Sequence, residues 1–144
     1  RLKLPALPRR ADPAADAGRG GYILHEPARA PHAIVIATGS EVHIALEAAT
    51  QLEADGIPTR VVSLPSWELF AAQDAAWRER VLPANITARV SIEAASTFGW
   101  QRFVGSAGRM IGIDHFGASA PGERLFQEFG FTAARVIDAV RALA

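Results

Sequence analysis

The segment from Ala33 to Leu64 constrains the fold more than any other part of the sequence. It begins with AIVIAT at Ala33–Thr38, a continuous apolar run that is typical of a strand covered on both faces. A second strand is expected at Thr59–Leu64, where the sequence reads TRVVSL. Between the two, apolar residues recur at the spacing of one helical face, at Val42, Ala45, Leu46, Ala49 and Leu52. This strand–helix–strand unit predicts two parallel strands joined by a right-handed crossover.

The rest of the chain continues this alternation. Further strands are expected at Tyr22–His25, Arg89–Ile92 and Arg109–Ile113. Helices are expected at Asp74–Leu82, Phe98–Ala107 and Pro121–Phe129, with a turn or short helix at Pro65–Ala72. A last helix is expected to be capped by Thr132 and to bury Val136, Ile137, Val140 and Leu143.

The alternation of elements also sets the expected fold class and domain limits. Alternating strands and helices predict an α/β domain with a mainly parallel sheet. Residues 1–20 are rich in Pro, Ala, Arg and Gly and lack helical or strand periodicity. We therefore expect them to form a linker, and the folded domain to span residues 21–144.

The composition excludes several classes of function. Lys and Arg number 15, as do Asp and Glu, and this balance argues against a protein that coats nucleic acid or acidic membranes. The sequence has no Cys, which excludes disulfides, Cys-ligated metal sites and thiol catalysis. No apolar run approaches the roughly 20 residues that span a bilayer, and no secretory leader is recognisable, so we expect a cytoplasmic protein. The single Met is Met110 and the sequence starts at Arg1, which indicates a processed product, a trimmed chain or a piece of a larger protein.

The strand–turn–helix sequence ATGSEV at Ala37–Val42 is the strongest local candidate for a binding site. A helix N-terminus that follows a strand presents free N–H groups to an anion. However, this turn has one Gly and no Lys, and Glu41 would repel a phosphate. We therefore favour ordinary helix capping, with Ser40 as the cap.

Asp114 and His115 are a second candidate because they follow the last predicted strand, where acid–base residues often lie in α/β proteins. No nucleophile is marked by a G-x-S-x-G motif, so a hydrogen-bonded loop pair is the simpler interpretation. The other histidines, His25, His32 and His43, form no recognised zinc motif with His115.

Large aromatic residues gather in the second half of the sequence. Core packing explains several of them, but a small domain seldom buries so many rings, and we expect part of the group to form a contact surface. The group comprises Trp67, Phe70, Trp77, Phe98, Trp100, Phe103, Phe116, Phe126, Phe129 and Phe131. From its residues alone, the sequence shows no set of side chains that could catalyse a reaction by itself.

Four stretches of the sequence carry a resemblance to a known family. They read ATGSEVHIALEAATQLEADGIPTRVVSLPSWELF, VLPANI, SIEAASTFGW and IGIDHFGASAPGERLFQEFGFT, in that order. With their spacing, they closely resemble the C-terminal domain of transketolases, and the resemblance extends from Arg1 to the end of the chain. It implies a small, mixed, mostly parallel five-stranded sheet flanked by helices.

The resemblance also implies what the full-length enzyme does. It would transfer a two-carbon ketol unit between sugar phosphates in the pentose phosphate pathway, with thiamine diphosphate and a divalent metal such as magnesium, as a homodimer. In the family, an N-terminal domain with a G-D-G motif holds the diphosphate and the metal, and this sequence has no such motif. The resemblance therefore assigns no catalytic, cofactor-binding or metal-binding residue to this segment, which would serve structure and subunit contacts.

Arg1 is the one substrate-binding residue that the resemblance suggests. The family pattern S-R-Q-x-L-P, whose Arg contacts the substrate phosphate, aligns with Arg1–Pro5, although Leu2 replaces the Gln. A linker Arg without that role is the alternative. For the whole chain, an independent regulatory or binding module of the same fold is the alternative to an inactive part of a ketol transferase, while a stand-alone hydrolase or dehydrogenase lacks the expected motifs.

Overall fold

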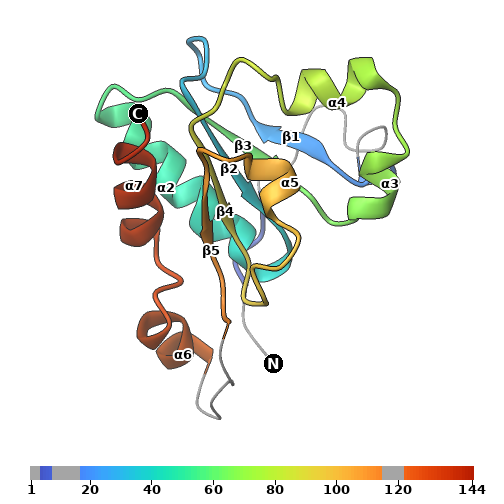
Figure 1. The fold of residues 1–144 in the computed structure, drawn as a ribbon. Coiled ribbons are helices and arrows are strands. Elements are labelled where there is room, and N and C mark those ends of the chain that lie inside the picture. Colours follow the sequence, from blue (N-terminus) through green and yellow to red (C-terminus); the bar gives the residue numbers. More distant parts are fainter. Residues whose placement is uncertain (1–3, 8–16, 115–121) are drawn as a thin grey trace.

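A five-stranded mixed sheet forms the centre of the domain (Figure 1). The computed structural model describes residues 4–7, 17–114 and 122–144. The strands lie in the order β1-β3-β2-β4-β5, with β1 antiparallel to β3 and every other pair parallel. Their bounds are β1 Tyr22–His25, β2 Ala33–Ala37, β3 Thr59–Ser63, β4 Arg89–Ile92 and β5 Arg109–Ile111. This arrangement confirms the predicted fold class.

Helices cover both faces of the sheet (Figure 1). On one face, α2 (Val42–Ala54) and α7 (Ala133–Arg141) pack together over Val35 of β2. On the other face, α3 (Trp67–Ala71), α4 (Ala75–Val81) and α5 (Gln101–Val104) pack over Ile34 and Ile36. The short helix α6 (Gly122–Glu128) precedes α7. None of the helices in the described ranges has the length and apolar character needed to cross a bilayer.

β2 is the strand on which both cores depend. All five of its residues are fully buried, because β3 and β4 flank it and helices cover both of its faces. Alternate residues of a strand point to opposite faces, so Val35 enters one core while Ile34 and Ile36 enter the other. The continuous apolar run in the sequence is therefore explained by burial on two sides.

The last helix follows the prediction from its sequence. The Thr132 side chain accepts a hydrogen bond from the backbone N–H of Arg135 and so caps α7. Val136 and Val140 are fully buried, while Ile137 and Leu143 are partly buried against the same core.

Two predicted elements are shorter than expected. The helix predicted at Phe98–Ala107 is reduced to α5, and it cannot begin before Gly99, where φ is +87° and the backbone is far from helical. A Cβ at Gly99 would lie 2.8 Å from the Trp67 ring, so this position also permits a close approach. The strand predicted to reach Ile113 ends at Ile111.

The chain enters the sheet through Gly20 and Gly21, which are fastened to α3 and α4. The Gly20 carbonyl accepts a hydrogen bond from the Ser66 N–H at 3.0 Å, and the Gly21 carbonyl accepts one from Nε1 of Trp77 at 3.0 Å. Gly20 has φ of +78°, and a Cβ there would lie 2.5 Å from the backbone nitrogen of Phe70. The Arg19 guanidinium lies 4.1 Å from the centroid of the Trp77 ring.

A buried arginine ties β3 to the end of α4 and to the segment after β1. Arg60 is 8% exposed, and its Nε and Nη2 donate to the two carboxylate oxygens of Glu26 at 2.7 and 2.8 Å. Its Nη1 donates to the carbonyls of Arg80 and Val81, which a helix C-terminus otherwise leaves without partners. The guanidinium therefore satisfies both a carboxylate and a helix end.

Replacing Arg60 should destabilise the domain more than replacing its carboxylate partner. Arg60→Met removes the donor of the buried Val81 carbonyl and of the partly buried Arg80 carbonyl, and we expect it to lower the free energy of unfolding by about 2 to 4 kcal/mol. Glu26→Gln retains those carbonyl bonds and an acceptor oxygen, and should cost about 1 kcal/mol or less. Urea unfolding followed by circular dichroism measures both. Equal losses would show that the helix-end contacts contribute little.

Candidate functional site

Ligands of α/β proteins usually bind at the carboxyl edge of the sheet, where the strand order reverses. In this fold the reversal falls between β2 and β4, because the chain passes from β2 to β3 on one side and later to β4 on the other. The segments that border this position are the turn after β2, with the 3-10 helix η1 (Gly39–Glu41), and the residues after β4. The ATGSEV candidate therefore lies at the expected place for a site.

The chain's own carboxylate occupies this position. Glu41 is only 3% exposed, and its Oε2 accepts a hydrogen bond from the Ala94 N–H at 3.1 Å, across from β2 to β4. Its other oxygen accepts the Ser40 hydroxyl. A buried negative charge at this point opposes the binding of a phosphate or any other anion. Glu41 thus joins the turn after β2 to the residues after β4 at the edge where related folds hold ligands.

The prediction that Ser40 caps the following helix is wrong. No side chain caps α2, because the 3-10 helix η1 leads directly into it and Glu41 takes the N-cap position. Ser40 therefore lies inside η1, where its hydroxyl donates to the Glu41 carboxylate. The anion-binding interpretation of the same turn has no support from this geometry either.

Asp114 fastens the end of β5 to the loop after β4. Its Oδ1 accepts the Thr97 N–H at 2.9 Å and the Ser96 hydroxyl at 3.3 Å, and its Oδ2 accepts the Thr97 hydroxyl at 2.8 Å. A carboxylate held by these donors orders a loop junction. His115 lies outside the described residues, so its predicted pairing with Asp114 stays a prediction.

Among the remaining histidines, His25 contacts a carboxylate. Nε2 of His25 lies 2.5 Å from Oε1 of Glu53 in α2, which joins β1 to that helix. Among residues 4–7, 17–114 and 122–144, no three His, Cys, Asp or Glu side chains gather as a metal site would require.

Most of the described aromatic residues belong to the cores. Trp100 is 1% exposed, and its ring meets that of Trp67 edge-on with centroids 5.1 Å apart. Phe98 differs because it is 88% exposed on the loop after β4, close in sequence to the residues that Asp114 holds. The expected contact surface therefore reduces to Phe98 and its surroundings in the described part, and Phe116 lies outside it.

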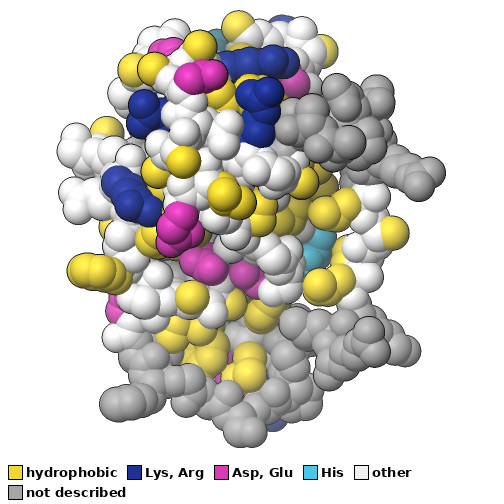
Figure 2. All heavy atoms as spheres, turned by 90° about the vertical axis from the view of Figure 1, so that its right-hand side faces the viewer, with side chains coloured by type: hydrophobic (Ala, Val, Ile, Leu, Met, Phe, Trp, Pro, Cys, Tyr) yellow, Lys and Arg dark blue, Asp and Glu magenta, His cyan; other side chains and the backbone are white. Residues whose placement is uncertain are grey.

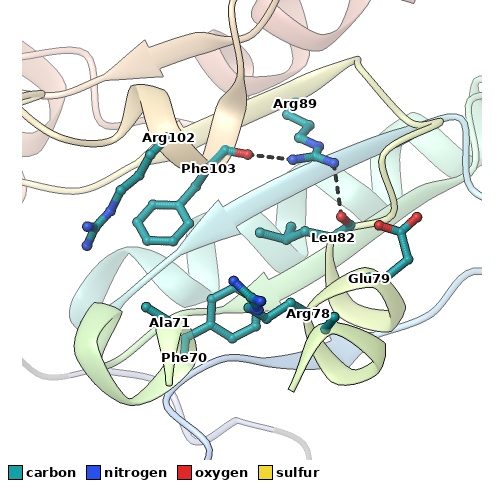
Figure 3. A pocket seen from close by; sticks show the side chains of 9 residues that line it. Phe70, Ala71, Arg78, Glu79, Leu82, Arg89, Arg102 and Phe103 are labelled. Carbon is teal, nitrogen blue, oxygen red and sulfur yellow. Dashed lines mark hydrogen bonds between the residues drawn. The ribbon is translucent and has the colours of Figure 1, made fainter. Parts of the chain in front are cut away.

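A pocket of about 440 Å³ lies on the opposite side of the sheet from α2, between α3, α4 and α5 (Figure 3). Arg78 of α4, Arg89 of β4 and Arg102 of α5 line it, together with Glu79. Figure 2 shows Arg side chains in the upper half of the face that carries α3 and α4, with apolar side chains among them. Sequence patterns do not reveal this site, because its arginines come from three separate elements and form no local motif.

Comparison with known proteins gives a consistent set of similarities. Residues 20–132 match the family model described as the transketolase-like TK C-terminal domain. Transketolase 7 of Craterostigma plantagineum is 50% identical over 147 residues, which cover 99% of this chain and 21% of that protein. Transketolase 2 of Vibrio vulnificus is 48% identical over 143 residues, which cover 99% of this chain and 22% of that protein.

Solved structures agree with the sequence relatives. The transketolase from Leishmania mexicana superposes with a TM-score of 0.81 at 37% identity, over 88% of this chain and 18% of that one. A split gene transketolase, described as an inactive beta4 tetramer, gives a TM-score of 0.71 at 26% identity, over 97% of this chain and 46% of that one. The chain spans about a fifth of the length of the curated relatives it matches.

The role of Glu41 as a bridge between loops can be tested by stability. Glu41→Ala removes the acceptor of the Ala94 N–H and leaves a cavity, and we expect the free energy of unfolding to fall by about 2 to 3 kcal/mol. Glu41→Gln retains an acceptor oxygen and the side-chain volume, and should cost less than half as much. Urea unfolding measures both variants. A glutamine variant as unstable as the alanine variant would contradict the bridging role.

Proposed function

The chain belongs to the transketolase family, and we propose that it is the C-terminal domain of a longer enzyme that transfers a two-carbon ketol unit from a ketose phosphate to an aldose phosphate in the pentose phosphate pathway. The observation that carries this proposal is the length relation: 99% of the chain aligns at 50% identity with a plant relative, yet covers 21% of it. Solved relatives from Pichia stipitis, 35% identical, are described as complexes with sedoheptulose-7-phosphate and xylulose-5-phosphate.

We also propose that this domain is inactive alone and serves structure and subunit contacts in a homodimer. The buried Glu41 carboxylate at the carboxyl edge of the sheet supports the proposal, as does the split-gene relative, a tetramer that is described as inactive. The exposed Phe98 is the side chain that best fits a contact with another domain or subunit. Residues 1–20 would then connect the preceding domain to residues 21–144.

The described residues do not fit a complex of thiamine diphosphate with its metal ion. Divalent magnesium requires several oxygen ligands, and the described ranges hold no cluster of carboxylates to supply them. At the sheet edge, the buried Glu41 carboxylate would repel a diphosphate. We therefore place both groups in other domains of the enzyme and assign no step of catalysis to this chain.

Titration calorimetry tests this separation of roles. The isolated 144-residue chain should show no magnesium-dependent binding of thiamine diphosphate at dissociation constants below about 1 mM. The full-length enzyme is the control and should bind the cofactor when magnesium is present. A saturable site on the isolated chain that requires magnesium would contradict the proposal.

Arg1 is proposed to bind the terminal phosphate of the sugar in the full-length enzyme, on the family pattern alone, because it lies outside the described residues. Arg1→Ala should remove a charge-assisted contact of about 2 to 4 kcal/mol and lower kcat/KM for phosphorylated sugars by about 30- to 1,000-fold. The loss should fall mainly on KM, because the phosphate lies far from the reacting carbonyl. Steady-state kinetics in the full-length enzyme measures it.

Two controls make this assay specific. Hydroxypyruvate, a donor without a phosphate, should react almost equally with Arg1→Ala and the unaltered enzyme. Lys3→Ala removes a neighbouring cation and should leave both substrate classes nearly unaffected. Equal losses for both substrates in Arg1→Ala would assign Arg1 a structural role, and no loss would leave it a linker residue.

An independent regulatory or binding module of the same fold remains the competing proposal. The mass of the native gene product, detected in a cell extract with an antibody to this domain, separates the two. A species several times larger than 15.3 kDa supports the enzyme. A cytoplasmic location stays a prediction, and a potato relative, 52% identical over 87% of this chain, is named as a chloroplastic transketolase.

A further inference from the structure

The pocket between α3, α4 and α5 carries positive charge that no ion pair in the described part neutralises. Its titratable lining consists of three guanidinium groups and one carboxylate, which gives 3 − 1 = +2. The described ion pairs involve none of Arg78, Arg89 and Arg102. The Glu79 carboxylate accepts the Ala84 N–H at 2.9 Å and so is engaged with the backbone.

Arg89 forms a fixed cationic wall of this pocket. Its guanidinium donates to the carbonyls of Phe103 at 2.7 Å, Leu82 at 3.1 Å and Pro83 at 2.8 Å, and its Nε donates to Ile86 at 2.8 Å (Figure 3). Neutral carbonyls hold the side chain in place without cancelling its charge. Burial lowers the pKa of Arg89 from its usual value, and the nearby Glu79 opposes that shift. The group still remains charged at neutral pH, because an arginine side chain is not deprotonated in proteins.

Arg78 and Arg102 supply adjustable donors at the pocket's edge. Both are exposed, and Arg78 extends across the pocket toward Phe70 (Figure 3). The guanidinium of Arg102 lies 4.9 Å from the Trp67 ring centroid and 4.8 Å from that of Phe103. A guanidinium stacked on a ring keeps the N–H groups at its rim free to bind an anion.

The remaining walls are apolar, and they restrict what the anion can be attached to. Phe70 and Phe103 line the pocket beside the arginines. The volume of about 440 Å³ lies within the roughly 300 to 1,000 Å³ of small-molecule sites. A phosphate monoester carries about 1.5 to 2 negative charges at neutral pH, which matches the local charge of +2.

We propose that this pocket binds a small organic phosphate, with the phosphate between Arg78, Arg89 and Arg102 and a compact ring against Phe70 and Phe103. The forked guanidinium groups of Arg78 and Arg102 can bind phosphate oxygens in pairs. Arg89 already donates four of its five N–H groups to carbonyls, and it supplies positive charge and the remaining Nη1–H. The aromatic rings pack against the organic part of the ligand. The site lies away from the carboxyl edge of the sheet, where Glu41 contacts Ala94. It does not depend on the proposed ketol transfer, because every residue of it belongs to this chain.

Calorimetry with phenyl phosphate tests the proposal on the 144-residue chain. We expect saturable binding with a dissociation constant below about 1 mM, and binding of inorganic phosphate or phenol at least about tenfold weaker, because each offers only half of the contacts. The tryptophan emission should change with the same midpoint, because an anion bound by Arg102 alters the electrostatic environment of the Trp67 ring on which that guanidinium stacks. No saturation up to about 10 mM would overturn the proposal, as would equal affinities for phenyl phosphate and inorganic phosphate.

Substitutions of the two exposed arginines locate the site. Arg78→Gln and Arg102→Gln should each weaken phenyl phosphate binding at least about tenfold. The fold should survive both, because neither side chain is buried, whereas Arg89 is left intact to keep its carbonyl contacts. Arg29→Gln, an exposed arginine in the turn after β1, is the matched control and should bind as the unaltered chain does. A similar loss in Arg29→Gln would reveal non-specific attraction and overturn the proposal.

A last experiment distinguishes a ligand site from a surface that another part of the enzyme covers. The full-length enzyme should bind phenyl phosphate with an affinity within about threefold of the 144-residue chain. Loss of binding in the full-length enzyme would show that other residues fill the pocket there, and would overturn its assignment as a ligand site.

Discussion

The complete burial of β2 is the constraint on which the rest of the domain depends. A strand with no solvent-exposed residue must pair on both edges and must be covered on both faces. β3 and β4 provide the pairing, and two separate sets of helices provide the cover. The two cores therefore share one strand, and a change in the register of β2 would exchange their side chains.

The same strand leads to the position where α/β folds usually gain a function, and here that position is used for structure. Glu41 bridges to Ala94, and Asp114 gathers donors from the loop after β4. Two carboxylates of the chain itself thus hold together the loops at the carboxyl edge of the sheet. This agrees with our proposal that the domain supports an enzyme whose chemistry lies in other domains. The proposed ligand site, the arginine pocket, lies instead between α3, α4 and α5.

What the sequence could predict depended on how far apart the interacting residues lie. β2, α2 and the Thr132 cap depend on neighbours within a few positions, so apolar spacing and a capping residue were enough to predict them. Ser40 was misassigned because its environment is set by Glu41, whose partner Ala94 lies 53 residues away. The arginine pocket was missed for the same reason, since β4 contributes Arg89 and two helices contribute the other arginines. Arg1 and His115 lie outside the described residues and remain predictions.

The fastening of Gly20 and Gly21 to α3 and α4 determines how mechanical load enters the domain. A pull on the segment before Arg19 would first meet the hydrogen bonds to Ser66 and Trp77 and the Arg19 stack, ahead of any strand pairing. These contacts would act in parallel, so the load would be shared before β1 could peel from β3. Movements of the segment before Arg19 would thereby reach the helices that line the arginine pocket before they reach the sheet.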